Sequence, residues 1–506
     1  MILLRWLYSL LGYLLLPLVV LFLLVPRKGR QGYGWRIREL FGFPRFTPDP
    51  SCRGVVWFHT VSVGETAAAT PLIREFHRRH PELQVVITTT TATGAARARQ
   101  AGDFVSHLFA PLDYPHAIAV FLSRIRPCAL VIMETELWPN WLAACSRRQV
   151  PVILMNARMS ERSCRRYGKL GPVFPYLIAD HLSLVLCQNQ EDAGRFRSLG
   201  VRGIQVTGSV KCDIVPPEEQ RLRGGALRRI LGPGPVWIAA STHEGEDELM
   251  LSVQEKVLAS HPGAVLLLAP RHPERFAAVT ALARRRFAGS VLLSELDPLL
   301  PGAAGDQAVD QIADHDREQS GDLVGGSAQE QVPVPEDRSG NAPAKVLEEL
   351  PANGSGNLTG NDPVNDQENG QGTQIKGRSP VVVCDAMGRM FELFAAADLA
   401  VMGGSFADIG GHNPLEPAAL GRPVIMGPHY RNFREFTQKM SKEGGLLLAG
   451  DQEELAGALV RLLGDQEERR RMGAAALGVV TAGQGATERT LEQIDLLLRS
   501  RSGGSG

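Results

Sequence analysis

The chain has 506 residues, more than one hydrophobic core normally supports, which predicts two or three domains. Its 54 basic residues balance 54 acidic residues, so the net charge does not favour nucleic acid as a partner. The seven cysteines are scattered and form no Cys-x-x-Cys pair. They therefore indicate neither a disulfide framework nor a zinc site, and they favour a reducing cytoplasm.

The first expected element is an uncharged apolar run from Trp6 to Val25. Its length is about that of a helix that crosses a bilayer, and basic residues at positions 27, 28 and 30 favour the cytoplasmic side for the rest of the chain. We therefore expect residues 1–26 to be a membrane anchor. Two alternatives remain open. One is a cleaved signal peptide, although no small-x-small site precedes Pro26, and the other is a helix lying in the membrane interface, because Pro17 interrupts the run.

Short apolar runs alternate with helix-like segments in two blocks, residues 27–213 and 236–501, separated by a polar, glycine-rich linker at 214–235. This alternation is typical of parallel sheets covered on both faces, so we expect an α/β fold with two domains. Ligands of such sheets lie at the carboxyl ends of the strands, and a cleft between two domains can hold two substrates. The expected strands are Val55–Val61, Val85–Thr89, Leu130–Met133, Val152–Met155, Leu182–Cys187 and Gln205–Thr207, then Val236–Ala240, Val265–Ala269, Val291–Leu293, Val381–Cys384, Leu399–Met402 and Pro423–Met426.

Residues 300–377 interrupt the second block. They are rich in Gly, Asp, Gln, Asn and Pro and nearly lack aromatic residues, which is the composition of disorder. Asp314-His315-Asp316 within this segment resembles a metal-binding Asp-x-Asp, but we interpret it as a chance match in a flexible acidic stretch. The sequence therefore predicts no metal site.

Side chains with catalytic potential follow the expected strands, beginning with Glu65. Gly64 allows a tight turn after the first strand, and Glu65 falls in the first turn of the next helix, over the strand ends. A helix N-terminus stabilises an ionised carboxylate, so we expect Glu65 to be deprotonated and ready to accept a proton. The alternative is a glutamate that only complements the helix dipole.

Two further motifs end strands of the first block. Glu134 and Glu136 precede Trp138 and Pro139, and one carboxylate can bind a substrate hydroxyl while the other holds the loop. Lys211 can neutralise a phosphate or a carboxylate of a ligand, or alternatively form a salt bridge between the domains.

The second block carries a glycine-rich segment, Gly403–Pro417, that resembles half of a nucleotide pocket. Glycine allows a ligand to approach the backbone closely, and Asn413 and Glu416 lie at the start of a helix expected over Pro417–Leu420. A carboxylate beside such a turn can bind ribose hydroxyls. Arg271 supplies a guanidinium for phosphate at another strand end. Glycine pairs alone are more often simple turns than parts of a nucleotide pocket, so the other motifs of the chain have to decide between these two interpretations.

Six strings of the chain resemble, in the same order, motifs of the 3-deoxy-D-manno-oct-2-ulosonic acid (Kdo) transferases of lipopolysaccharide synthesis. The resemblance extends over nearly the whole chain outside residues 300–377 and implies the GT-B fold, in which two Rossmann-like domains face a cleft. The strings are HTVSVGE (59–65), METELWPN (133–140), GSVKCD (208–213), STHEGE (241–246), APRHPERF (269–276) and GGHNPLEPA (410–418).

The resemblance implies an inverting glycosyltransferase that moves Kdo from CMP-Kdo to a lipid A precursor of the lipid IVA type, without metal or other cofactor. It also implies a place at the bacterial inner membrane, with both large domains on the cytoplasmic side. Glu65 resembles the base that deprotonates the acceptor hydroxyl, and Glu134 and Lys211 resemble residues proposed to stabilise the transition state. The implied CMP-binding residues are Arg271, His272, Met387, Gly388, Arg389, Asn413, Pro414, Leu415 and Glu416.

A basic, partly apolar surface near Arg36 and Arg38 suits an anionic, bisphosphorylated lipid acceptor. Another membrane-associated GT-B transferase with a UDP-sugar donor is the alternative enzyme, and its nucleotide motif should differ around Asn413–Glu416. A membrane-anchored sugar- or lipid-binding protein without catalytic activity is the alternative from another class. The presence of both Glu65 and the nucleotide turn argues against it, because a binding module needs no base.

Overall fold

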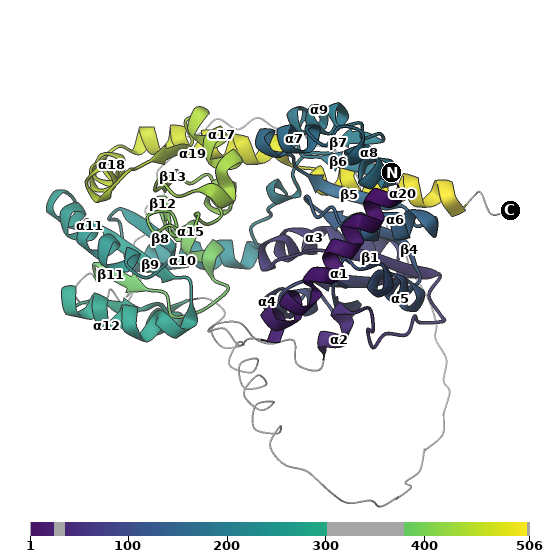
Figure 1. Ribbon diagram of the computed structural model, residues 1–506. Coiled ribbons are helices and arrows are strands. Elements are labelled where there is room, and N and C mark those ends of the chain that lie inside the picture. Colours follow the sequence, from purple (N-terminus) through teal and green to yellow (C-terminus); the bar gives the residue numbers. More distant parts are fainter. Residues whose placement is uncertain (1, 25–35, 301–378, 503–506) are drawn as a thin grey trace, which may run out of the picture.

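The structure is a computed structural model and describes residues 2–24, 36–300 and 379–502. Residues 301–377 of the expected insert, including Asp314–Asp316, and the basic residues at positions 27, 28 and 30 lie outside the described residues. The described part contains two α/β domains that lie side by side (Figure 1).

The first domain is built on a seven-stranded sheet in the order β3-β2-β1-β4-β5-β6-β7, in which every pair of neighbours is parallel. Its strands are β1 (Gly54–His59), β2 (Leu83–Thr89), β3 (Val105–Phe109), β4 (Pro127–Met133), β5 (Val152–Ala157), β6 (Leu184–Cys187) and β7 (Ile204–Val206). The helices of this part of the chain are α2 (Ile37–Leu40), α3 (Val63–Arg79), α4 (Ala92–Arg99), α5 (Pro115–Ile125), α6 (Pro139–Arg147), α7 (Glu161–Gly168), α8 (Val173–Leu177) and α9 (Gln190–Ser198).

The second domain repeats this plan with a parallel seven-stranded sheet in the order β10-β11-β9-β8-β12-β13-β14. Its strands are β8 (Val236–Thr242), β9 (Val265–Pro270), β10 (Val291–Leu292), β11 (Val381–Val383), β12 (Leu399–Met402), β13 (Val424–Met426) and β14 (Leu446–Leu448). Its helices are α11 (Glu246–Ser260), α12 (Phe276–Arg286), α13 (Leu293–Leu296), α15 (Met390–Ala396), α16 (Leu415–Ala419), α17 (Arg434–Lys442), α18 (Gln452–Gly464) and α19 (Gln466–Gly483).

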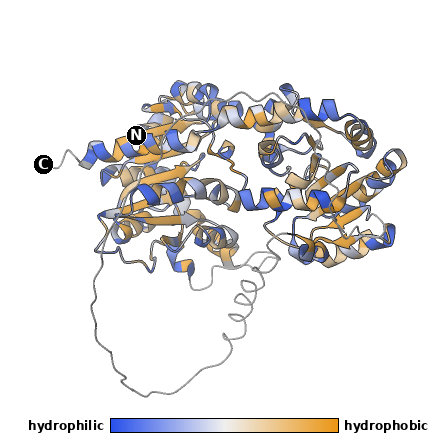
Figure 2. Ribbon diagram, turned by 180° about the vertical axis from the view of Figure 1, so that it is seen from behind, coloured by the Kyte–Doolittle hydropathy of each residue, from blue (hydrophilic) through white to orange (hydrophobic). Residues whose placement is uncertain are grey.

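The cores lie on both faces of each sheet, because the strands are apolar along their length rather than on one side. Figure 2 shows hydrophobic residues concentrated in the strands of both domains. The α/β fold with two Rossmann-like domains, the GT-B architecture, is therefore confirmed. The helix expected at Pro417–Leu420 starts earlier, at Leu415, because the Asn413 side chain accepts a hydrogen bond from the Leu415 N–H at 3.1 Å.

Two strands at sheet edges, β3 and β14, were not expected from the sequence. In β3 only the last two residues are buried, and Ser106 and His107 interrupt its apolar pattern. In β14 only Leu446 is buried. Polar residues hide β3 in the sequence, whereas β14 is a short apolar run of three leucines that the sequence analysis did not select.

The C-terminal helix α20 (Ala486–Ser502) crosses back from the second domain to the first. Leu491 and Ile494 are fully buried in the core of the first sheet, and Asp495 lies 2.7 Å from the His80 ring. The sequence analysis assigned these residues to the second block, 236–501, whereas the structure packs them on the first domain. The sequence does not reveal this crossing, because it depends on contacts between distant parts of the chain. The expected linker at 214–235 is mostly helix α10 (Glu218–Leu231), which packs against α15 of the second domain.

The N-terminal helix α1 (Ile2–Leu24) lies along the surface of the first domain (Figure 1). Within the described residues it is the one helix long and apolar enough to cross a membrane, over Leu3–Leu21.

Candidate functional site

Glu65 lies where α3 begins, directly after β1. Its carboxylate accepts hydrogen bonds from the Val61 N–H (2.8 Å) and the Ser62 hydroxyl (3.2 Å), and the Ser62 hydroxyl caps the helix. The pKa of Glu65 is raised to about 7, chiefly by burial and also by the nearby carboxylates of Glu134 and Glu136, against the lowering effect of the Val61 hydrogen bond. Desolvation therefore opposes the stabilisation of the ionised carboxylate that we expected from the helix N-terminus.

Glu134 and Lys211 form an ion pair beside Glu65. Glu134 follows β4 with a positive φ of 59°, and its Oε1 lies 2.5 Å from the Lys211 Nζ. Their side chains are 24% and 21% exposed, so a ligand can reach the pair. The alternative in which Lys211 bridges the two domains is not what the structure shows, because its carboxylate partner belongs to its own domain.

Two polar residues that the sequence analysis did not select lie next to this pair. Asn156 in β5 has a positive φ of 52°, and its Oδ1 accepts the Val210 N–H at 3.2 Å. The Asn156 Nδ2 and the buried Ser209 Oγ have no partner among the described residues. Strained backbone and unsatisfied polar groups cluster at functional sites, and these two strand ends follow that rule. No local motif identifies Asn156, because it lies inside an apolar strand.

The glycine-rich turn of the second domain is held by Glu246, another residue that sequence reasoning missed. Its buried carboxylate accepts the backbone N–H groups of Gly404 (2.7 Å), Phe406 (2.9 Å), Ala407 (3.1 Å) and His243 (2.9 Å). A glycine is required at the start of this turn, because a Cβ on residue 403 would lie 2.4 Å from the Ser241 carbonyl oxygen.

Glu416 lies at the start of α16, beside this turn. The Asn413 Nδ2 donates to the Glu416 Oε1 at 3.2 Å, while Pro414 and Leu415 are buried and support the turn. Burial raises the pKa of Glu416, and the Asn413 hydrogen bond and the Arg271 charge oppose that shift. In the described part of the chain the second carboxylate oxygen has no protein partner, so it can accept a ligand hydroxyl.

Three histidines surround the same turn. His412 and His243 stack in parallel with their Nε2 atoms 2.8 Å apart, and His272 packs edge-on against His243. The pKa of His412 is lowered to about 3, chiefly by burial and also by the charge of the exposed Arg271. The structure thus brings Arg271 and His272 together with the Asn413–Glu416 turn, as expected. Sequence reasoning gave no role to His243 or His412, although both lie in the motifs it selected.

The Met387–Arg389 turn offers a nucleotide fewer free groups than the sequence analysis expected. The Arg389 guanidinium is 13% exposed and donates to Glu392 (3.0 Å) and Asp297 (2.8 Å), so these two carboxylates already occupy it. Met387 and Gly388 remain exposed, and Gly388 has a positive φ of 82°. Within the described residues, this turn shares no hydrogen bond or ion pair with the Asn413–Glu416 turn.

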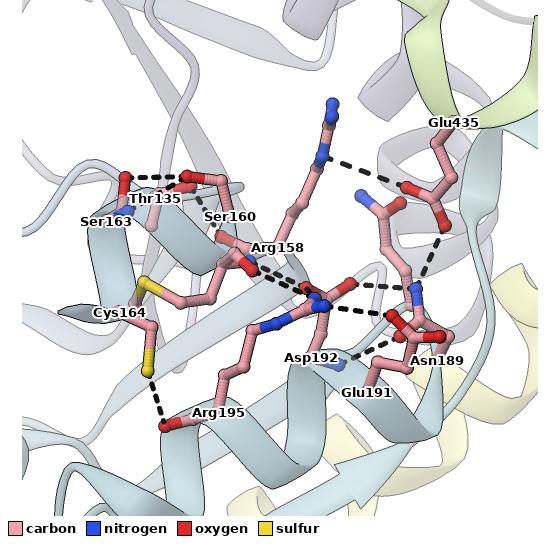
Figure 3. A network of polar contacts seen from close by, with 12 residues as sticks. Thr135, Arg158, Ser160, Ser163, Cys164, Asn189, Glu191, Asp192, Arg195 and Glu435 are labelled. Atoms are coloured by element: carbon pink, nitrogen blue, oxygen red, sulfur yellow. Dashed lines mark hydrogen bonds and ion pairs between the residues drawn. The ribbon is translucent and has the colours of Figure 1, made fainter.

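A polar network joins the two domains next to the Glu134 loop (Figure 3). Glu435 of α17 accepts the Asn189 Nδ2 at 2.9 Å and lies 3.7 Å from Arg158, and the Thr135 hydroxyl donates to the Arg158 carbonyl oxygen. No group of three or more His, Cys, Asp or Glu side chains is placed to hold a metal ion in the ranges 2–24, 36–300 and 379–502.

Two linked Rossmann-like domains define the class of proteins with the GT-B fold. In the first domain the Glu65 carboxylate lies beside the Glu134–Lys211 ion pair, and in the second a polar turn lies at the equivalent strand ends. Comparison with known proteins narrows this class. A family model described as 3-deoxy-D-manno-octulosonic-acid transferase (kdotransferase) matches residues 35–214. The 3-deoxy-D-manno-octulosonic acid transferases of Haemophilus influenzae and Bordetella pertussis are both 32% identical to the chain. They cover 96% and 97% of it, over 97% and 99% of their own lengths.

The chain belongs to the Kdo transferase family and is a glycosyltransferase. Among solved structures, the C-terminal CMP-Kdo binding domain of WaaA from Acinetobacter baumannii is similar at 20% identity and a TM-score of 0.34, over 52% of this chain and 98% of that one.

Proposed function

We propose that the protein transfers Kdo from CMP-Kdo to a hydroxyl of a lipid A precursor of the lipid IVA type, with Glu65 as the base. The observation that carries this proposal is the partly buried Glu65 carboxylate, whose pKa of about 7 is matched to accepting a proton near neutral pH. It lies at the carboxyl ends of the strands, beside the Glu134–Lys211 pair. We infer the donor and the acceptor from family membership.

The reaction is a single displacement at the anomeric carbon of Kdo. The acceptor hydroxyl gives its proton to Glu65 while its oxygen forms the new bond to that carbon. The bond from the carbon to the CMP phosphate breaks, and CMP leaves on the opposite side, which inverts the configuration. Lys211 supplies a positive charge where negative groups of donor and acceptor meet, and Glu134 holds it in place.

The donor nucleotide binds in the second domain. Glu416 accepts the ribose hydroxyls through its free carboxylate oxygen, and the exposed Arg271 lies close enough to Glu416 and His412 to hold the phosphate. Met387 and Gly388 contribute exposed backbone, whereas the ion-paired Arg389 supports their turn. We place the protein at the bacterial inner membrane through α1, with both domains on the cytoplasmic side.

Mass spectrometry of the lipid product tests this proposal directly. The protein is incubated with lipid IVA and CMP-Kdo, and a mass increase of one or more Kdo units is expected. Excess CMP should inhibit the reaction and excess UDP should not. Transfer from a UDP-sugar instead, or inhibition by UDP alone, would identify the alternative GT-B enzyme and overturn the donor assignment.

A further inference from the structure

The centre of the apolar helix α1 is fixed to the first domain by polar side chains. The Tyr8 hydroxyl donates to the Asp113 carboxylate at 2.9 Å, and the Ser9 hydroxyl donates to the Asn140 side-chain oxygen at 3.1 Å. Ser9 is buried in this contact, at 5% exposure. The helix therefore contacts the domain through its middle and not only through its C-terminal end.

One turn further along, the contact continues on the same side of the helix. The Tyr114 hydroxyl donates to the Gly12 carbonyl oxygen at 3.1 Å, and the Tyr13 hydroxyl lies 2.6 Å from the His116 Nδ1. A Cβ on Gly12 would come within 3.2 Å of the Tyr114 ring, so the glycine permits the close approach. The two tyrosine rings also pack together, with centroids 5.1 Å apart.

The opposite side of α1 is a row of exposed leucines. Residues 8, 9, 12 and 13 share one side of a helix with about 3.6 residues per turn, and the leucines follow at spacings of three and four on the other side. Their exposed fractions lie between 55% and 81%. This leucine face consists of Leu3, Leu7, Leu10, Leu14, Leu18 and Leu21.

The docked position that these contacts define is incompatible with a membrane-spanning position of α1. The candidate span is Leu3–Leu21, and Tyr8, Ser9 and Tyr13 lie in its middle. In a spanning helix they would be within a hydrocarbon layer about 30 Å thick, where the polar surface of the first domain cannot follow. Asp113 and Asn140 would then lose their partners on α1. The docked and the spanning positions are therefore mutually exclusive.

A basic surface continues from the C-terminal end of the helix. Leu23 packs in a small cluster that includes Phe41, and Phe41 borders a hollow of about 760 Å³. Arg38 and Arg124 line this hollow, and the Arg124 guanidinium lies over the ring of the half-exposed Phe43. Basic and aromatic side chains beside an apolar helix face suit the headgroup layer of an anionic bilayer.

We propose that α1 lies flat in the surface of an anionic phospholipid bilayer, with the leucine face among the lipids and the opposite side fixed to the first domain. This inference rests on the proposed membrane location and replaces a spanning anchor with an interfacial one. It also places the catalytic loop at the membrane. Asp113 accepts the N–H groups of Asn140 (3.3 Å) and Trp141 (3.0 Å), which begin α6 directly after the loop that carries Glu134.

A disulfide between α1 and α6 tests the proposal. The full chain with Ser9→Cys and Asn140→Cys is bound to vesicles that contain phosphatidylglycerol and is oxidised mildly, and only the membrane-bound fraction is analysed. An intramolecular disulfide is expected. The matched control combines Leu10→Cys with Asn140→Cys and should form none, because Leu10 belongs to the leucine face. Absence of the α1–α6 disulfide from the membrane-bound Ser9→Cys, Asn140→Cys variant would overturn the flat position.

Two further measurements keep the outcome unambiguous. Arg38→Gln combined with Arg124→Gln should weaken binding to anionic vesicles roughly thirtyfold and leave binding to neutral vesicles unchanged. An unchanged affinity for anionic vesicles would show that Arg38 and Arg124 do not face an anionic bilayer. That result would contradict the proposal even if the cysteine variants fail to fold. With Leu14→Cys, disulfides between chains would show that a second copy covers the leucine face, which also overturns the proposal. If the protein transfers Kdo in detergent but binds no vesicles, the membrane location fails while the proposed reaction stands.

Discussion

Glu65 and Glu246 occupy equivalent positions in the two domains, yet their surroundings give them different tasks. Each follows the first strand of its domain along the chain, β1 or β8, which lies inside its sheet, and each lies in the first turn of the next helix. Glu246 accepts four backbone N–H groups and is 2% exposed. Glu65 accepts one backbone N–H and one hydroxyl and remains partly open. A saturated carboxylate fixes a turn, whereas a partly satisfied one can take a proton.

Glu65→Gln should have the largest effect on turnover. The amide keeps the shape of the side chain but cannot accept the acceptor's proton, so we expect kcat for Kdo transfer to fall by about 10² to 10⁴ with CMP affinity unchanged. Quenched-flow or mass-spectrometric assays measure the loss, and calorimetry measures CMP binding. Glu161→Gln is the matched control, because Glu161 also lies in a first helical turn but is exposed. Substantial turnover by the Glu65 variant would contradict the assignment of Glu65 as the base.

Glu246→Gln should act on stability instead. One carboxylate oxygen becomes an amide nitrogen that faces two backbone N–H donors, so we expect unfolding to become easier by about 3 kcal/mol. Thermal and urea unfolding measure this change, and the loosened turn should also weaken CMP. Glu248→Gln, in the same helical turn but exposed, should change neither quantity. If both variants unfold alike, the buried carboxylate does not hold the glycine-rich turn.

The pH dependence of catalysis should reveal the role of Glu65. Because Glu65 must be ionised to act as base, kcat/KM should rise about tenfold per pH unit up to about pH 7 and then level off. The contribution of Glu65 to folding stability has the opposite trend. A raised native pKa makes it full below the unfolded pKa of about 4.5 and lost as the pH rises through about 7. A rate profile that is flat between pH 5 and 8 would contradict the pKa near 7.

Glu416→Ala should weaken CMP binding about tenfold, since one charge-assisted hydrogen bond to the ribose is lost. Asn413→Ala should have a smaller effect, because Asn413 acts on the nucleotide through Glu416 and the helix start. Isothermal titration with CMP compares the two variants. Equal CMP affinities for the wild type and the Glu416 variant would mean that the Asn413–Glu416 turn supports the fold and does not bind the nucleotide.

Much of the fold could be predicted from the sequence, because buried parallel strands are apolar along their whole length and this pattern is local. The inner strands and the edge strands β7 and β10 were predicted in this way. The edge strand β3 was missed because polar residues interrupt it, and β14 was missed because it is only three residues long. The positions of Glu65, Glu134 and Glu416 at strand ends were equally visible, since glycine turns and helix starts are short-range signals.

The tertiary structure decided which groups meet these side chains. Lys211 pairs with Glu134 from 77 positions away, and Gly404 donates to Glu246 from 158 positions away. The pKa of Glu65 depends on burial by the assembled domain, which opposes the shift expected from the helix N-terminus. Likewise, the apolar run at the N-terminus predicted a membrane helix, and the proposal that this helix lies flat rests on its contacts with Asp113 and Asn140. The periodicity of the sequence indicates which faces of a helix or strand are apolar. The burial of a side chain and its hydrogen-bond partners depend on distant segments, which only folding brings together.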